Sequence, residues 1–137
     1  MANGLFDLLH VGHLRYLQSA ARMGDFLVVA VNNDRSAHRL RGPGRPVIKD
    51  RDRAFLIAAI RGVDVVLLFG TDTVTPVLRR LRPDVHCKGT DYTPATVPER
   101  DVVLSYGGKI RIAGDEKRHA SSTLLRKIGK RRAARRG

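Results

Sequence analysis

Continuous apolar runs that alternate with helical segments are the feature of this sequence that most constrains its fold. Residues 25–33 read Asp-Phe-Leu-Val-Val-Ala-Val-Asn-Asn, a run of the kind found where a parallel strand is buried on both faces. Residues 63–69 and 84–88 have the same character, and residues 109–112 form a shorter candidate strand. These four runs predict the strands of one parallel sheet.

Helical segments separate the predicted strands. Leu14, Leu17 and Ala21 recur at a spacing of three to four, which predicts a helix that ends at Gly24. Further helices are predicted at residues 50–61, 73–81, 98–106 and 121 to about 132. The alternation predicts an α/β fold, a single-domain doubly wound parallel sheet with helices on both faces. Residues 39–49, rich in Gly, Pro and Arg, and residues 90–98 are expected to be the least ordered.

Sheets of this kind bind their ligands beyond the carboxyl ends of the strands, where the strand order reverses. The loops that matter are therefore residues 4–13, 33–49, 70–73, 88–98 and 113–122. Charge points to the kind of ligand, because 26 Lys and Arg residues face 13 Asp and Glu residues and leave a net charge of +13. A basic protein suits an anionic substrate such as a nucleotide or a sugar phosphate.

A run of basic residues begins at Arg126, and residues 129–137 form a basic tail. The tail could bind nucleic acid, but we favour a solvated, frayed helix end.

Cys87 is the single cysteine, so an internal disulfide is excluded. No apolar stretch approaches the roughly eighteen residues that span a bilayer, and the start of the chain lacks a secretory signal pattern. We therefore expect a cytoplasmic protein without a membrane anchor.

The segment from Gly4 to His13 carries the strongest chemical signal. His10 and His13 are three residues apart where a helix opens, so their side chains lie on one face. Gly12 between them lets a phosphate approach the backbone closely, and the helix start offers unpaired N–H groups. Each imidazole can donate a hydrogen bond to a phosphoryl oxygen as charge builds. Two histidines that are close by accident, or half of a metal site, are the weaker alternatives.

Two further groups of residues suit phosphate binding. Arg39, Arg41 and Arg45, with Lys49 nearby, could close over a triphosphate because guanidinium groups match phosphate geometry. Arg41 is the best candidate of this set, although a solvated basic loop is an equal alternative for any one residue. The hydroxyls of residues 121–123 could cap the last helix and also hold phosphates at its N-terminus.

These motifs together resemble the cytidylyltransferase-like nucleotidyltransferase superfamily, and within it the heptose 1-phosphate adenylyltransferase domains. The similar segments span residues 3 to 128 in the same order. They are Gly4-Leu5-Phe6-Asp7 with His10-Val11-Gly12-His13, Asn32-Asn33-Asp34, Arg39-Leu40-Arg41-Gly42 with Arg45-Pro46-Val47, Lys88-Gly89-Thr90-Asp91-Tyr92, Gly107-Gly108-Lys109, and Ser121-Ser122-Thr123 with Ile128.

The resemblance implies transfer of AMP from ATP, accompanied by Mg²⁺, to D-glycero-β-D-manno-heptose 1-phosphate, which gives ADP-heptose and pyrophosphate. A cytidylyltransferase acting on glycerol 3-phosphate or another polyol phosphate is the alternative within the same chemistry. The implied catalytic residues are His10, His13, Arg41 and Lys88. The implied nucleotide-binding residues are Gly4, Phe6, Asp7, Gly12, Asp34, Ser121, Ser122 and Thr123. Asp7 could instead cap the first helix, and Asp34 could contact the ribose or a metal.

The sequence also departs from that family. Only Met1 and Ala2 precede Asn3-Gly4, so the first strand is expected to be truncated or replaced by a few residues. Thr90 replaces a usual Gly, and a kinase domain that is sometimes fused to the family is absent from these residues. We expect a nucleotidyltransferase domain over residues 1–128, followed by the tail. An incomplete sheet edge suggests a homodimer, and the short first strand leaves a catalytically dead nucleotide-binding homologue as an alternative.

Overall fold

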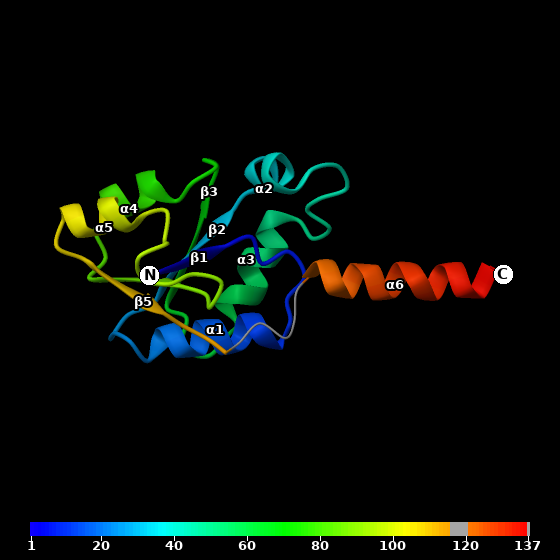
Figure 1. Ribbon diagram of the computed structural model, residues 1–137, viewed down its shortest axis with the longest axis horizontal. Coiled ribbons are helices and arrows are strands. Elements are labelled where there is room, and N and C mark those ends of the chain that lie inside the picture. Colours follow the sequence, from blue (N-terminus) through cyan, green and yellow to red (C-terminus); the bar gives the residue numbers. More distant parts are fainter. Residues whose placement is uncertain (116–120, 137) are drawn as a thin grey trace.

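Five parallel strands form one sheet at the centre of the protein (Figure 1). The computed structural model describes residues 1–115 and 121–136. The strands lie in the order β3-β2-β1-β4-β5. Their bounds are β1 (Ala2–Gly4), β2 (Val28–Asn32), β3 (Val65–Phe69), β4 (Val85–Lys88) and β5 (Lys109–Ile112). Each of the four apolar runs contains one of these strands, which confirms the predicted α/β fold.

Helices cover both faces of the sheet. They are α1 (Val11–Ala21), α2 (Asp34–Arg41), α3 (Asp50–Ala58), α4 (Thr75–Leu81), α5 (Arg100–Ser105) and α6 (Ser121–Arg136). Leu17 of α1 and Ile57 of α3 are fully buried in one apolar cluster, against Val29 of β2. Leu78 of α4 and Val103 of α5 are buried in a second cluster on the opposite face. The alternating strand residues thus pack against α1 and α3 on one side and α4 and α5 on the other.

The first strand is short, as expected, but it lies in the middle of the sheet. It pairs with β2 from Ala2↔Val29 to Gly4↔Val31, and with β4 at Ala2↔Cys87. Three residues suffice because neighbours on both sides satisfy the backbone hydrogen bonds. The idea that this strand leaves an incomplete edge is therefore wrong, since β3 and β5 are the edges. A homodimer stays a prediction that this argument no longer supports.

Helix α2 corrects the expectation for the loop after the second strand. We expected residues 39–49 to be poorly ordered, but α2 extends to Arg41. Asn33 caps its N-terminus by accepting a hydrogen bond from the Ser36 N–H at 3.0 Å, and Gly42 ends it with a φ of 83°. Most side chains of α2 are polar, so apolar periodicity could not reveal the helix.

The last helix, α6, extends away from the sheet in Figure 1. It continues through Arg136, so the predicted boundary between residues 128 and 129 falls inside a helix. Within the part of the chain that the structure describes, no helix combines the length and apolar character needed to span a bilayer. The order of the strands reverses between β1 and β4, which places the functionally important edge at their carboxyl ends.

Candidate active site

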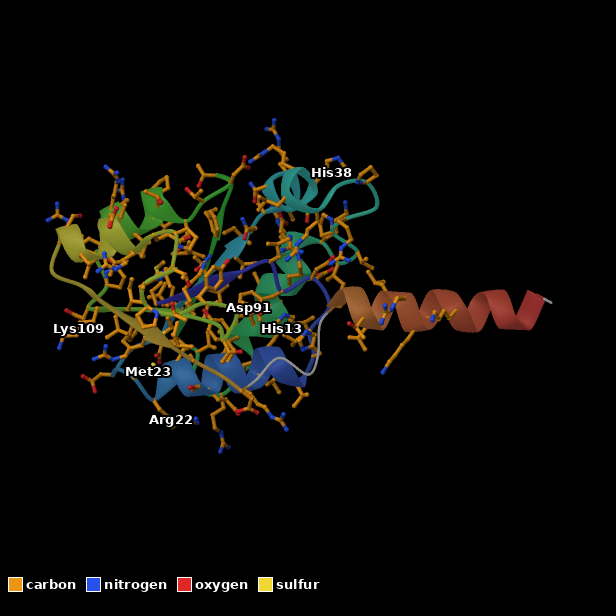
Figure 2. The ribbon with its side chains drawn as sticks, in the orientation of Figure 1. His13, Arg22, Met23, His38, Asp91 and Lys109 are labelled. Atoms are coloured by element: carbon orange, nitrogen blue, oxygen red, sulfur yellow. The ribbon has the colours of Figure 1, made fainter. Side chains whose placement is uncertain are left out.

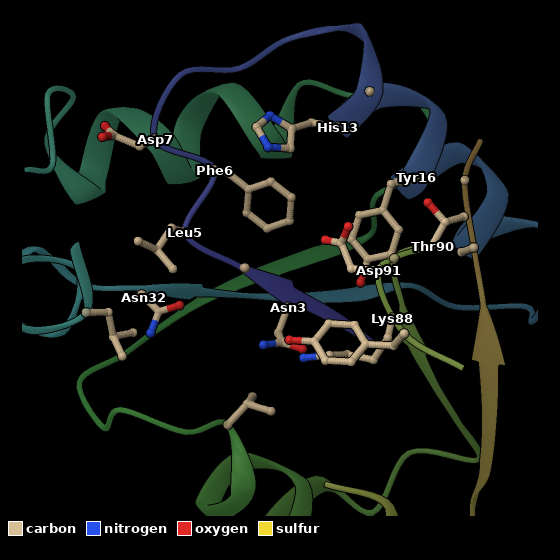
Figure 3. Close-up of a pocket in the computed structure, with 18 of the residues that line it drawn as sticks. Asn3, Leu5, Phe6, Asp7, His13, Tyr16, Asn32, Lys88, Thr90 and Asp91 are labelled. Atoms are coloured by element: carbon tan, nitrogen blue, oxygen red, sulfur yellow. The ribbon is translucent and has the colours of Figure 1, made fainter. Parts of the chain in front are cut away.

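A cavity of about 730 Å³ opens at the carboxyl edge of the sheet (Figure 3). The segments that follow all five strands contribute to its walls. It contains both histidines of the first loop, Arg41 from the end of α2 and Lys88 from the end of β4. The structure therefore brings together the four predicted catalytic residues, although their distances along the sequence are large. Gly4, Phe6, Asp7 and Gly12 also line the cavity.

Backbone hydrogen bonds at the start of α1 orient the two histidines. His10 is the N-cap residue, and its Nδ1 accepts a hydrogen bond from the Gly12 N–H at 3.2 Å. The Nδ1 of His13 accepts from the backbone N–H of His10 at 3.4 Å, which completes a capping box built from imidazoles. The rings are stacked, with centroids 3.8 Å apart and planes at 19°.

This capping arrangement also sets the chemical form of the two rings. A nitrogen that accepts a hydrogen bond carries no proton, so each neutral imidazole has its proton on Nε2. Both rings are thus prepared as Nε2–H donors. A donor pair of this kind suits an anion that lies at the helix opening. The alternative role for Asp7, capping this helix, is wrong because His10 occupies the capping position.

The ring of Phe6 packs against His13 of the histidine pair. Its ring lies edge-on to His13 with centroids 5.2 Å apart and stacks on Tyr16 at 6.4 Å (Figure 3). The backbone of Phe6 has a positive φ of 49°, and a Cβ at Gly4 would lie 3.0 Å from its ring. Gly4 therefore gives room to the ring of Phe6 as well as to a phosphate. Burial raises the pKa of the Tyr16 hydroxyl, which stays protonated and donates to the Cys87 carbonyl.

Asp7 is buried and binds protein groups. Its carboxylate accepts hydrogen bonds from the backbone N–H groups of Val47 and Ile48 at 2.8 and 3.0 Å, and pairs with Arg45 at 2.6 Å. These contacts fix residues 45–48 over the start of the first loop. Asp7 thus lines the cavity while its carboxylate organises the basic segment, a role that sequence reasoning missed.

The predicted cluster of basic residues is divided among different partners. Arg39 pairs with Asp72 on the loop after β3, and Arg45 pairs with Asp7. Arg41 lines the cavity and, within residues 1–115 and 121–136, has no acidic partner in an ion pair. Lys49 lies outside this cavity, in a shallow depression beside α2. Arg41 is therefore the member of the set that is placed to meet an anion.

Lys88 lies beside a buried acidic residue that the sequence did not reveal. Its Nζ is 3.5 Å from Oε2 of Glu99 and 5.0 Å from the centre of the Tyr92 ring. Nε2 of the fully buried His86 is 3.7 Å from the same oxygen. Burial lowers the pKa of His86, so its ring is neutral. Burial alone would raise the pKa of Glu99, but His86 and the Lys88 charge outweigh it and hold that pKa below its usual value.

Two of the predicted nucleotide-binding residues that the structure describes, Asp34 and Thr123, do not line this cavity. Asp34 pairs with the buried Arg53 at 3.1 Å and accepts from the Asp50 N–H, so its carboxylate joins α2 to α3. Thr123 belongs to α6 and is not among the residues that line the cavity. The side chains of Ser121 and Ser122 lie outside the described part of the structure, and their proposed phosphate contacts stay predictions.

The fold and the cavity define a class of protein. It is an α/β nucleotide-binding protein with hydrogen-bond donors and cations gathered where the strand order reverses. Comparison with known families identifies this class further. The model of the cytidylyltransferase-like family matches residues 1–128.

Curated relatives and a solved structure agree with that match. A bifunctional protein HldE from Gluconobacter oxydans is 52% identical over 124 residues, which cover 90% of this chain and 26% of the relative. Its counterpart from Syntrophotalea carbinolica is 45% identical over 126 residues, or 92% of this chain and 26% of the relative. This chain therefore spans about a quarter of the length of these relatives. The crystal structure of a lipopolysaccharide core biosynthesis protein from Thermoplasma volcanium has a TM-score of 0.66 and 29% identity, covering 82% of this chain and 90% of that one.

The chain belongs to the cytidylyltransferase-like family. It is an enzyme of the nucleotidyltransferase class. The stacked histidine pair, which the sequence motif predicted, lies at the cavity of that enzyme.

Proposed function

We propose that this enzyme transfers AMP from the magnesium complex of ATP to D-glycero-β-D-manno-heptose 1-phosphate, releasing pyrophosphate and forming ADP-heptose. The observation that carries the proposal is the pair of stacked, Nε2-protonated imidazoles at the opening of α1, inside a cavity large enough for a nucleotide. The resemblance of residues 3–128 to heptose 1-phosphate adenylyltransferase domains supports the choice of substrates. So does the lipopolysaccharide context of the solved structure that this fold resembles.

The reaction is an in-line displacement at the α-phosphorus of ATP. An oxygen of the acceptor phosphate forms a new bond to that phosphorus, and the bond to the oxygen bridging the α- and β-phosphates breaks. Pyrophosphate leaves with the electron pair of that bond. The attacking oxygen is already anionic, so the reaction needs no strong general base. Catalysis then depends on positioning and on stabilising negative charge.

Four residues would supply that stabilisation. The Nε2–H groups of His10 and His13 would donate to the α-phosphate and the bridging oxygen. Arg41 at the end of α2 and Lys88 at the end of β4 come from opposite sides of the order reversal. They would bind the remaining phosphate charge. One donor of this kind contributes on the order of 3 kcal/mol to transition-state stabilisation.

Magnesium would arrive with the nucleotide. Among residues 1–115 and 121–136, no group of three His, Cys, Asp or Glu side chains could hold a metal ion. Imidazole, guanidinium and ammonium groups line the cavity and suit phosphate oxygens. Five carboxylates also line it, those of Asp7, Asp72, Asp91, Glu99 and Asp115. Mg²⁺ would be part of the substrate, MgATP, and would shield the triphosphate charge.

A donor and acceptor screen tests the proposal. The purified chain is incubated with MgATP or MgCTP and with heptose 1-phosphate or glycerol 3-phosphate, and pyrophosphate release is measured. We expect release only with ATP and the heptose phosphate, with ADP-heptose as the second product. Release with CTP and glycerol 3-phosphate would transfer the assignment to the polyol phosphate alternative. The absence of release with every pair would contradict the proposal and favour a nucleotide-binding homologue without activity.

A further inference from the structure

Glu99 occupies an unusual position for a carboxylate. It is the N-cap residue of α5, yet its side chain makes no capping hydrogen bond with that helix. The side chain instead lies against β4 and is only 8% exposed. Burying a carboxylate in this way is unfavourable unless a cation and polar groups compensate for the lost hydration. The partners of Glu99 therefore explain why an acidic residue is there.

Those partners are two side chains on the same face of β4. Residues 86 and 88 are two apart on a strand, so His86 and Lys88 point toward the same side of the sheet. Both approach the same oxygen of Glu99, His86 from 3.7 Å and Lys88 from 3.5 Å. His86 is fully buried, whereas Lys88 and Glu99 both line the cavity. The neutral His86 lies on the buried side of the cluster. Lys88 lies on its cavity side, where Figure 3 labels it.

The cluster restricts a side chain that is otherwise flexible. Lysine has four rotatable bonds and a compact ammonium group, so it holds no fixed direction without partners. Here the Glu99 carboxylate attracts the ammonium on one side, and the face of the Tyr92 ring lies 5.0 Å from it on another. A buried ion pair of this kind contributes little to stability compared with apolar residues of the same size. The Lys88 charge faces a ligand cavity, and this position gives the ion pair a functional reason.

We infer that Glu99 is a positioning residue, which holds the Lys88 ammonium at the cavity for a phosphate group of the substrate. The inference rests on the proposed function and deepens it. Glu99 itself does not touch the phosphate, because two anions would repel one another. It acts through Lys88, and its effect on the reaction should disappear when Lys88 loses its charge.

A double-mutant cycle tests that dependence. Glu99→Gln keeps the shape of the side chain and removes its charge, and Lys88→Gln removes the cation. We expect Glu99→Gln alone to lower kcat/KM, or to weaken MgATP binding, by about tenfold. In the Lys88→Gln background the same change should have an effect below about twofold, since residues that act as a unit are not additive. Effects that add fully in both transfer and MgATP binding would overturn the inference.

Two further variants separate positioning from a merely structural role. Glu99→Asp retains the charge and should recover most of the activity lost in Glu99→Gln. Asp101→Asn is the matched control, because it removes a carboxylate from the same helix that is 97% exposed and does not approach Lys88. It should leave both transfer and binding unchanged. If Glu99→Asp is as impaired as Glu99→Gln while its unfolding midpoint falls, the carboxylate is structural and the inference is wrong.

A measurement without substrate keeps the two proposals distinguishable. The ¹⁵N signal of the Lys88 ammonium, assigned by its loss in Lys88→Gln, should be sharp and slowly exchanging in the unmodified protein. It should be lost to rapid exchange in Glu99→Gln. A rapidly exchanging Lys88 ammonium in the unmodified protein would overturn the inference whether or not any pyrophosphate is released. An ordered ammonium together with no release would contradict only the proposed function.

Discussion

The histidine turn (residues 10–13) and the basic segment (residues 39–49) both border the cavity, but they are ordered in different ways. In the histidine turn, the side chains bind backbone groups two or three residues away, as His10 does with Gly12 and His13 with His10. In the basic segment, order comes from distant partners. Val47 and Ile48 donate to Asp7 across some forty residues, and Arg39 reaches Asp72.

The difference teaches which parts of a site can be predicted from sequence. A turn that is stabilised by its own residues carries its geometry in its motif, because donors and acceptors are fixed by spacing. A segment that is ordered by remote carboxylates carries no local sign of them. The two regions also treat their basic side chains differently. The helix start fixes the directions of the two imidazoles, whereas acidic partners engage Arg39 and Arg45.

The largest effect is expected from His13→Ala in the histidine turn. Loss of one Nε2–H donor should reduce turnover about a hundredfold or more, with little loss of stability. Steady-state pyrophosphate release measures turnover, and urea unfolding measures stability. His38→Ala is the matched control, because His38 is exposed on α2 and does not line the cavity (Figure 2). Unchanged turnover in folded His13→Ala would remove the catalytic role of the turn.

Asp7→Asn tests whether the basic segment depends on its remote partner. The variant leaves Arg45 without its counterion and weakens two backbone hydrogen bonds, so the free energy of unfolding should fall by about 2 kcal/mol. Amide exchange at Val47 and Ile48 should accelerate by the factor that corresponds to this change in free energy. Asp72→Asn, which breaks the exposed pair with Arg39, should change stability by less than about 0.5 kcal/mol. Equal effects of the two variants would contradict the distinction between them.

Arg41→Gln and Arg39→Gln compare two residues of the same segment. Arg41 lines the cavity, so its loss should raise the KM for MgATP about fivefold without affecting stability. Arg39 is engaged with Asp72 and should affect KM by less than about twofold. Steady-state kinetics at several ATP concentrations measure both. A larger effect from Arg39 would mean that the pair opens when nucleotide binds.

The smallest effect is expected from removing residues 129–137, a third basic region. Residues 129–136 belong to the distal part of α6. Transfer should stay within about twofold of the full chain. If the tail instead binds nucleic acid, binding to a short RNA or DNA probe should be strong in the full chain and collapse after the deletion. Loss of transfer in the shortened chain would show that the tail supports the active site.

Most strands and the histidine motif were predictable because apolar runs and local spacing determine them. The segment 109–112 shows this, since its strand has the bounds that the sequence indicated. Helix α2 was missed because its buried residues are chiefly Ser36 and Ala37, which give no apolar stripe. Glu99 was missed for another reason, because its pairing with residues 86 and 88 exists only after α5 packs beside β4. The sequence also did not show that the buried Arg53 pairs with the carboxylate of Asp34. A nucleotide contact of Asp34 stays a prediction.

The central claim is that the two stacked imidazole rings contact the phosphates of the nucleotide through Nε2. Histidine ¹⁵N spectra of the full chain, recorded with and without a non-hydrolysable MgATP analogue, test it most directly. We predict that both His10 and His13 show protonated Nε2 before ligand is added, and that both Nε2 signals shift when the analogue binds while the His38 signal stays in place. Binding of the analogue with no shift at either ring would contradict the account.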